Sequence, residues 1–276
     1  MHDIAREVLP IVEMLGPMLR AFHGSVDELK RKDDDRRSVV TRLDQNVERY
    51  LNRRLTELDR SIKFVGEEFG GNRDAERFWL CDPIDGTTQY IEGVDGCTTM
   101  VALIEEGEVV FSTIYDFPNY AMYYAEKGKG AFCNKYPIRV NRSTILATRE
   151  WEELAAEVAS DKKEFKVGFE SDLTKNPSHA QKRDSLAALA SVFKTGNAGH
   201  ELTRVARGSL SGRICLDPFG RDYDFAAGAF LVKEAGGVVA NIGSKNYDYR
   251  NLNFIAANPA LYLQLTEGPS ALFPVS

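Results

Sequence analysis

A segment with two closely spaced aspartates is the part of this sequence best suited to chemistry. After the apolar run 78–81 the chain continues as Asp82-Pro83-Ile84-Asp85-Gly86-Thr87-Thr88. Pro83 stiffens this loop and can hold both carboxylates on one side of it, while Gly86 lets the backbone approach a ligand. Free N–H groups at a helix or turn opened by Thr87 would form a seat for phosphate. Two carboxylates beside such a seat repel each other unless hard cations lie between them, and Mg²⁺ prefers oxygen ligands. The loop therefore predicts a joint site for magnesium and phosphate.

Two further acidic segments could complete this site. Glu67 and Glu68 follow an apolar run, a place where a pair of glutamates is more commonly a solvated strand end. Asp224 precedes small residues at 226–229, which would let a helix approach another element closely, but it is equally suited to cap that helix. Asp-Pro and Asp-Gly are themselves ordinary turn formers. Residue types alone leave the structural and the functional interpretations open.

The elements that must position these acids differ between the two parts of the chain. Apolar spacing over residues 3–29 predicts an amphipathic helix with a kink or short break at Pro10 and Pro17. A second helix is predicted over 45–58, with Thr41 and Asp44 both resembling helix-start residues. From residue 62, β-rich patterns predict two short strands and an antiparallel meander: 62–65, 78–81, 98–104, 109–115 and 122–126, with turns at 105–108 and 127–130.

Strands and helices alternate after about residue 140. The predicted strands are 165–170, 213–216, 238–240 and 254–257. The predicted helices are 184–192, 202–207, 223–235 (closed by Gly236-Gly237) and a segment near 259–265. A length of 276 residues with no repeat or linker indicates one large domain or two closely packed halves.

The composition argues against several functional classes. With 41 acidic and 35 basic residues the net charge is −6, and no basic stripe predicts nucleic-acid binding. An acidic protein that binds an anion needs local positive charge, which a metal ion can supply. No apolar run approaches the ~20 residues of a membrane span. The N-terminus lacks an apolar block with a cleavage site, so we expect a cytoplasmic protein without membrane contacts.

Cysteine, histidine and charge patterns suggest structural positions. The four cysteines are widely spaced and without a CxxC pair, which predicts reduced core thiols: Cys81, Cys97, Cys133 and Cys215. Four scattered histidines without HExxH argue against a histidine-based metal site. The mixed basic and acidic block at 30–37 predicts a solvated, mobile loop.

Taken together, the motifs resemble the signatures of the inositol monophosphatase family. GEE at 66–68, DPIDGTT at 82–88, and DYDFAAG followed by EAGG at 222–237 occur in the family's order, as does VTxxD at 40–44. The match covers nearly the whole chain. The resemblance implies a fold of the α+β or α/β class, a layered α-β-α-β-α sandwich. An N-terminal half, 1–140, would carry the metal-binding loop, and a C-terminal half, 141–276, would complete the site.

The resemblance also implies an activity and a set of residues. The activity is hydrolysis of a small phosphate monoester, such as inositol 1-phosphate, by direct attack of a water activated by two or three Mg²⁺ ions. The implied metal ligands are Glu67, Asp82, the Ile84 carbonyl, Asp85 and Asp224, together with the Thr87 hydroxyl. Gly86 and Thr87 would bind phosphate through their N–H groups. Asp44 and Thr87 would orient the attacking water, with Glu67 also in the catalytic group.

Two of the implied roles have structural alternatives. Asp44 is also suited to be the N-cap of the 45–58 helix. Asp217 falls where the family places an acid that contacts substrate hydroxyls, yet Asp217-Pro218 is equally a strand-end turn. Gln89-Tyr90 and Tyr223 stand where the family commonly has Asn-Phe and Trp, so the shape of the substrate pocket is open.

Several substrates and one different class of function are compatible with the resemblance. The GEEFG and DPIDGT elements also resemble the histidinol-phosphatase branch. Other relatives hydrolyse fructose 1,6-bisphosphate, 3′-phosphoadenosine 5′-phosphate or NADP, and some bacterial members are RNA-polymerase-associated regulators. The expected partners are a small phosphorylated metabolite and a second copy of the chain, because the family is usually dimeric.

Overall fold

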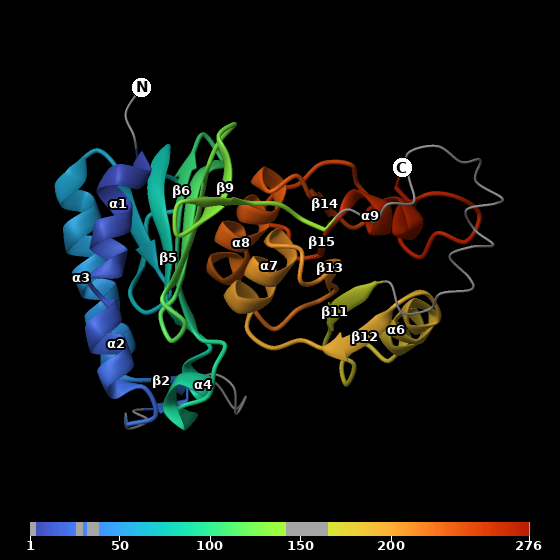
Figure 1. Ribbon diagram of the computed structural model, residues 1–276, viewed down its shortest axis with the longest axis horizontal. Helices are drawn as coiled ribbons and strands as arrows, with labels where there is room; N and C mark the ends of the chain where they lie inside the picture. Colours follow the sequence, from blue (N-terminus) through green and yellow to red (C-terminus); the bar gives the residue numbers. More distant parts are fainter. Residues whose placement is uncertain (1–3, 26–29, 32–38, 142–164, 276) are drawn as a thin grey trace.

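Five alternating layers of helices and sheets stack along the long axis of the molecule (Figure 1). The computed structural model describes residues 4–25, 30–31, 39–141 and 165–275. The layers are helices, a large sheet, helices, a smaller sheet and helices again, which confirms the expected α-β-α-β-α sandwich. The boundary between residues 140 and 141 stays a prediction, since 142–164 lie outside the described ranges.

The first helical layer consists of α1 (Ile4–Glu13), α2 (Gly16–Phe22) and α3 (Arg42–Leu58). The break predicted within 3–29 is confirmed, because α1 and α2 are separate helices and Pro17 lies in the first turn of α2. The predicted extent was wrong, since α2 ends at Phe22; residues 26–29 lie outside the described part. Val12, Leu51 and Leu55 are fully buried against the large sheet, each contributing about 1.5–3 kcal/mol through burial.

The large sheet has eight strands, in spatial order β10 (Tyr136–Ile138), β9 (Gly130–Cys133), β8 (Ala121–Glu126), β7 (Glu108–Asp116), β6 (Thr98–Glu105), β5 (Arg77–Asp85), β3 (Lys63–Gly66) and β4 (Gly70–Gly71). The antiparallel meander is confirmed from β5 to β10, and only β3 pairs in parallel, with β5. The turn between β6 and β7 uses positive φ at Glu106 and Gly107, which suits the twist of a hairpin.

Strand β5 extends further than the sequence predicted. The predicted strand was 78–81 and the following residues were expected in a loop, but β5 continues to Asp85, and Asp82 and Asp85 pair with β6. The register shifts between Asp82 and Asp85, so Pro83 lies at an irregular point of the pairing. Proline has no backbone N–H to donate, so the missing ladder hydrogen bond leaves no donor unpaired there. The Pro83 carbonyl instead accepts a hydrogen bond from Thr99 Oγ1 at 2.9 Å. The two aspartates therefore lie at the end of an interior strand of the large sheet.

The central helical layer contains α7 (Ala198–Ala206) and α8 (Asp222–Glu234). The prediction that small residues let α8 approach another element is confirmed at Gly228. A Cβ atom there would lie 2.5 Å from a Leu202 side-chain carbon, so only glycine allows this contact between α7 and α8. Both helices cover the opposite face of the large sheet from α1 and α3, and they bring Asp224 to the end of β5.

The smaller sheet has the order β12 (Ser191–Lys194), β11 (Lys166–Glu170), β13 (Gly212–Cys215), β15 (Phe254–Ala257) and β14 (Val238–Asn241), and α6 (Ser178–Leu189) and α9 (Pro259–Thr266) cover its outer face. The predicted helix 184–192 was wrong at both ends. Helix α6 begins six residues earlier and stops at Leu189, because Ala190 is extended and β-branched Val192 joins a strand parallel to β11.

A short two-stranded sheet lies apart from the two larger ones. Lys30 and Arg31 were expected in a loop but form β1 (Lys30–Arg31), which pairs with β2 (Val39–Val40); residues 32–37 lie outside the described part. All four cysteines are free, as predicted, and Cys133 is only half-buried. None of the helices in the described ranges is long and apolar enough to cross a bilayer.

Candidate metal centre

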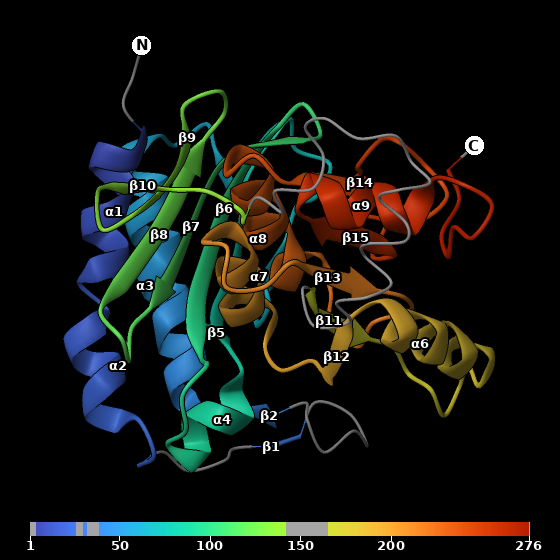
Figure 2. The ribbon, with the colours of Figure 1, turned by 45° about the vertical axis from the view of Figure 1, so that its right-hand side comes forward.

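Three carboxylates meet where the large sheet faces α8. Asp82 and Asp85 at the end of β5, and Asp224 in the first turn of α8, each place an oxygen within 4.8 Å of the others. Asp82 is 1% exposed and Asp85 is 5% exposed. In the described part of the chain, this is the only group of three or more candidate metal ligands. Figure 2 shows the end of β5 leading into α4 (Thr87–Glu92), with α7 and α8 beside it.

Burial makes the negative charge of this group costly. Asp85 Oδ2 accepts hydrogen bonds from the Gly199 N–H at 2.8 Å and the Thr98 hydroxyl at 3.2 Å, but desolvation still raises the pKa of Asp85 to about 7. Desolvation, with the charges of Glu67 and Asp85, raises the pKa of Asp224 well above its usual range. A cation bound among these oxygens would offset both effects.

The donor set fits a hard divalent cation. All three side chains offer carboxylate oxygens, and the described residues bring no histidine or cysteine into the group. Mg²⁺ takes such ligands and retains water or substrate oxygens in its remaining positions. The alternative interpretation of Asp224 as a helix N-cap was wrong, because Arg221 is the N-cap of α8. Asp224 is the third residue of α8, and its carboxylate accepts a hydrogen bond from the Arg221 N–H.

Glu67 lies beside the three aspartates without being one of the group. It follows β3 and is half-buried, and its backbone N–H donates to the Cys81 carbonyl at 3.2 Å, next to Asp82. The negative charge of Glu67 contributes to the raised pKa values of both Asp44 and Asp224. Its assignment as a metal ligand stays a prediction.

Asp44 contacts Thr87, the pairing that the family resemblance implied. Thr87 Oγ1 lies 3.3 Å from Asp44 Oδ1 and 3.1 Å from the Ile84 carbonyl oxygen. The interpretation of Asp44 as an N-cap was wrong, because Thr41 caps α3 and Asp44 lies three residues later. Asp44 Oδ2 accepts the Thr41 N–H and hydroxyl in a capping box, which leaves Oδ1 for Thr87. Burial raises the pKa of Asp44 to about 7.

Gly86 and Asp217 occupy unusual backbone conformations. Gly86 precedes α4 with φ 86°, and a Cβ atom there would lie 1.9 Å from Asn197 Nδ2, so the position requires glycine. Asp217 follows β13 with φ 53° and is exposed, and its carboxylate accepts a hydrogen bond from Asn176. The strand-end turn at Asp217 is thus present, and its contact with substrate stays a prediction.

A buried ionic network that the sequence did not predict lies near the site. Arg213 on β13 is 1% exposed and binds Glu170 on β11 and Glu201 on α7. The second oxygen of Glu170 accepts the Phe219 N–H at 3.0 Å, and that of Glu201 accepts the Gly196 N–H. The signal in the sequence was an arginine within the otherwise apolar strand pattern of 212–216.

The network connects the two segments that carry the site to the smaller sheet. Gly196 precedes α7, whose first turn donates the Gly199 N–H to Asp85. Phe219 lies in the segment that leads to Asp224. The charge of Arg213 also opposes the increase in the pKa of Asp85.

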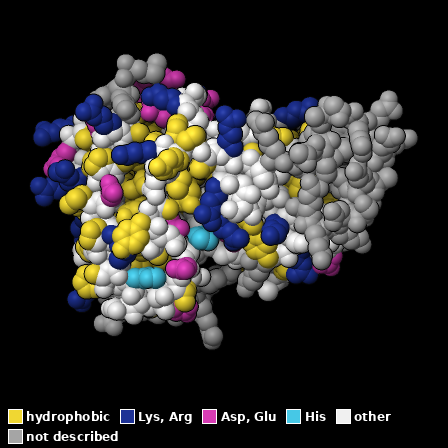
Figure 3. All heavy atoms as spheres, in the orientation of Figure 1, with side chains coloured by type: hydrophobic (Ala, Val, Ile, Leu, Met, Phe, Trp, Pro, Cys, Tyr) yellow, Lys and Arg dark blue, Asp and Glu magenta, His cyan; other side chains and the backbone are white. Residues whose placement is uncertain are grey.

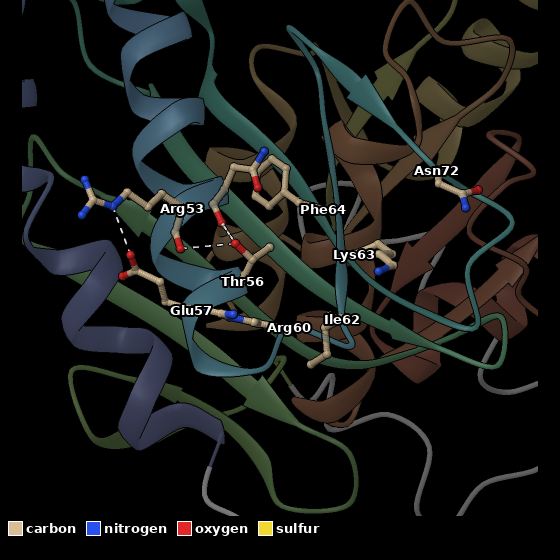
Figure 4. A pocket seen from close by; sticks show the side chains of 9 residues that line it. Arg53, Thr56, Glu57, Arg60, Ile62, Lys63, Phe64 and Asn72 are labelled. Atoms are coloured by element: carbon tan, nitrogen blue, oxygen red, sulfur yellow. Dashed lines mark hydrogen bonds and ion pairs between the residues drawn. The ribbon is translucent and has the colours of Figure 1, made fainter.

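An open surface pocket lies elsewhere, between the end of α3 and β3 (Figure 4). It is lined by Asn52, Arg53, Thr56, Glu57, Arg60, Ile62, Lys63, Phe64 and Asn72, none of which belongs to the carboxylate group. Arg53 pairs with Glu57 at 3.1 Å, and the Arg53 side chain is 78% exposed. Solvent-exposed pairs of this kind are typical of a hydrated helix surface, so we place no chemistry here.

Sequence and structure comparisons point to one family. The model of the inositol monophosphatase family matches residues 5–269. A putative Nus factor SuhB of Neisseria meningitidis serogroup B is 30% identical over 93% of this chain and 94% of its own length. A fructose-1,6-bisphosphatase/inositol-1-monophosphatase of Thermotoga maritima is 27% identical over 92% of this chain and 91% of its own.

The fold agrees with these sequence matches. The crystal structure of the extragenic suppressor protein suhB from Bartonella henselae superposes with a TM-score of 0.79 at 23% identity, over 95% of this chain and 96% of that one. The family match spans the three aspartates, the Asp44–Thr87 pair and both sheets. The chain therefore belongs to the inositol monophosphatase family.

Proposed function

We propose that this protein hydrolyses a small phosphate monoester of the inositol 1-phosphate type, with Mg²⁺ bound by Asp82, Asp85 and Asp224. The observation that carries the proposal is the meeting of three carboxylates from β5 and α8, two of them buried and one half-buried, next to the Asp44–Thr87 pair. Membership of the family supports a metal-dependent phosphomonoesterase. We assign Glu67 and the Ile84 carbonyl as further ligands because they border the same group.

The protein residues would bind the substrate and orient a water molecule. The Thr87 hydroxyl hydrogen points to Asp44 or the Ile84 carbonyl, which leaves an Oγ1 lone pair to accept a hydrogen bond from water. The N–H groups of Gly86 and Thr87 would hold phosphate oxygens. Bound Mg²⁺ would lower the pKa of a coordinated water and screen the phosphate charge. The water oxygen would bond to phosphorus as the ester P–O bond breaks, with one water proton passing to the leaving alcohol oxygen and the other staying with the inorganic phosphate.

The identity of the alcohol is the open part of the proposal. Relatives carry names that include inositol-1-monophosphatase and fructose-1,6-bisphosphatase. Asp217, held by Asn176 after β13, is the residue that we propose to contact substrate hydroxyls. Inositol 1-phosphate, histidinol phosphate, fructose 1,6-bisphosphate, 3′-phosphoadenosine 5′-phosphate and NADP are therefore the esters to compare.

Phosphate release from these five esters, with and without Mg²⁺, tests the proposal. We expect inositol 1-phosphate to be hydrolysed only when Mg²⁺ is present, because the carboxylate group alone repels the phosphate. The Asp44→Asn variant, which keeps the shape of the side chain but weakens its acceptor, should turn over more slowly on the same ester. Release from none of the five esters would contradict the enzymatic proposal.

A regulatory function is the second candidate. It is supported by the 30% identity to a relative named as a putative Nus factor. The net charge of −6 does not favour binding to RNA, so we expect such a function to depend on contacts with protein. Absence of turnover, together with binding to RNA polymerase, would favour it over catalysis.

We also propose that the protein forms a homodimer, as members of the family commonly do. One face carries a gathering of hydrophobic side chains (Figure 3). Tyr120 is 64% exposed and lies under the Arg20 guanidinium at 3.9 Å, and Val94, near His23, is 46% exposed. Exposed apolar patches often mark interfaces. Light scattering of the wild-type protein should give a mass of twice the 30.9 kDa chain mass. The Tyr120→Lys variant should give a lower mass, closer to that of a single chain. A wild-type protein that is monomeric would contradict the dimer.

A further inference from the structure

Glu48 is a buried carboxylate that the proposed reaction does not use. It lies on α3 and is 1% exposed, four residues after Asp44 and therefore on the same helix face. Its Oε2 accepts the Glu68 N–H at 2.6 Å, and its Oε1 accepts the Phe69 N–H at 3.0 Å. Both oxygens of one buried side chain are thus committed to a single backbone turn.

That turn carries Glu67, the proposed metal ligand after β3. Three consecutive N–H groups in it are fixed: Glu67 donates to the Cys81 carbonyl on β5, and the next two donate to Glu48 on α3. A further contact with α3 is the Arg49 guanidinium, 4.7 Å from the centre of the Phe69 ring. The backbone of Glu67 is therefore held between β5 and α3.

Gly66 shows how closely Glu48 packs on this turn. A Cβ atom at residue 66 would lie 2.1 Å from the Glu48 carboxyl carbon, because the carboxylate occupies the space of that side chain. Any other residue there would displace Glu48 or the turn. The contact with Glu48 therefore requires the glycine of the GEE motif.

We propose that Glu48 is a positioning residue that fixes the Glu67 turn against β5 and thereby sets the affinity for Mg²⁺. The inference rests on the proposed function, in which Glu67 is a metal ligand. Helix α3 then places two components at once, since Asp44 contacts Thr87 and Glu48 holds the turn of Glu67. The two acids are four residues apart on one face of α3, so one reaches Thr87 and the other reaches the turn that carries Glu67.

The geometry demands a carboxylate at position 48. Both acceptor oxygens face backbone N–H groups, so in Glu48→Gln the amide nitrogen would face one of these donors and accept no hydrogen bond. Side chains that orient metal ligands typically change metal affinity by ~10–100-fold when they are replaced. The same variant keeps the length and volume of the side chain, so the fold should remain.

Two measurements on the full-length protein test the proposal. In metal-free protein, we expect E48Q to increase hydrogen exchange at the Glu68 and Phe69 amides about tenfold or more. In calorimetric titration with Mg²⁺, we expect the Kd of E48Q to rise ~10–100-fold while kcat recovers at saturating Mg²⁺. Glu57→Gln is the matched control, because Glu57 lies on α3 but pairs only at the surface with Arg53 and Arg54.

The outcomes separate this inference from the proposed function. Wild-type protein that binds no Mg²⁺ would overturn the proposed function and the inference with it. An E48Q variant that binds Mg²⁺ as tightly as wild type would overturn the inference alone. Should E48Q not fold, Gly66→Ala displaces the same carboxylate from the other side and should weaken Mg²⁺ binding similarly; unchanged binding there would overturn the inference too.

Discussion

Replacing Asp85 with asparagine is expected to abolish phosphate release while the fold remains intact. Asparagine has the same shape, and its side-chain oxygen can accept the Gly199 N–H and the Thr98 hydroxyl. The variant loses the negative charge that would bind Mg²⁺ at the centre of the carboxylate group. If that charge stabilises the transition state by about 4 kcal/mol, kcat/KM falls ~10³-fold.

Thermal unfolding separates this effect from a loss of stability. The buried Asp85 charge is costly in metal-free protein, so Asp85→Asn should be at least as stable as wild type without Mg²⁺. Added Mg²⁺ should raise the Tm of wild type, through binding to the folded state, much more than that of the variant. Asp95→Asn is the control, because Asp95 is exposed and lies between α4 and β6. It should behave as wild type in both the phosphate-release and the thermal-unfolding assay. A fully active Asp85→Asn protein would refute the assignment of Asp85.

The second large effect is expected at Arg213, which lies between Glu170 and Glu201. Arg213→Met would leave two buried carboxylates without their cation, since Arg213 is 1% exposed and binds both. Removing one partner of a buried ion pair typically costs about 3–5 kcal/mol. Because whole domains are stable by only about 5–15 kcal/mol, urea unfolding should show a large decrease in the midpoint.

A triple variant distinguishes lost charge balance from lost packing. Glu170→Gln and Glu201→Gln, combined with Arg213→Met, remove all three charges but keep oxygens that accept the Phe219 and Gly196 N–H groups. The triple variant should recover most of the stability lost in Arg213→Met, because neutral replacements of buried ionic groups are often tolerated. A loss of less than about 1 kcal/mol in Arg213→Met would show that the network contributes little.

The sequence predicted those parts of the site whose residues are neighbours along the chain. Asp82 and Asp85 could be identified from their own segment of sequence, because proline, glycine and two acids within seven residues combine turn chemistry with metal ligands. Asp224 comes from a helix 139 positions further on, so only the order of motifs in the family connects it with them. Thr41 and Asp44 were correctly placed at a helix start, but Thr41 is the N-cap and Asp44 is the third residue of the helix.

The residues that support the site could not be predicted for the same reason. The contacts of Glu48 with Glu68, and of Arg213 with Glu170, bridge 20 and 43 positions of the sequence. Nothing in the local pattern says which buried acid meets which N–H group or cation. The boundary between α6 and β12 was missed because pairing with β11 outweighs the helical spacing of 184–192.

Anomalous scattering from crystals soaked with Mn²⁺ tests the metal centre most directly. Mn²⁺ takes the same oxygen ligands as Mg²⁺ and scatters anomalously. We predict a peak bound by the carboxylates of Asp82, Asp85 and Asp224, and no such peak in Asp85→Asn crystals. A fully occupied Mn²⁺ elsewhere, with none among these three carboxylates, would contradict the account.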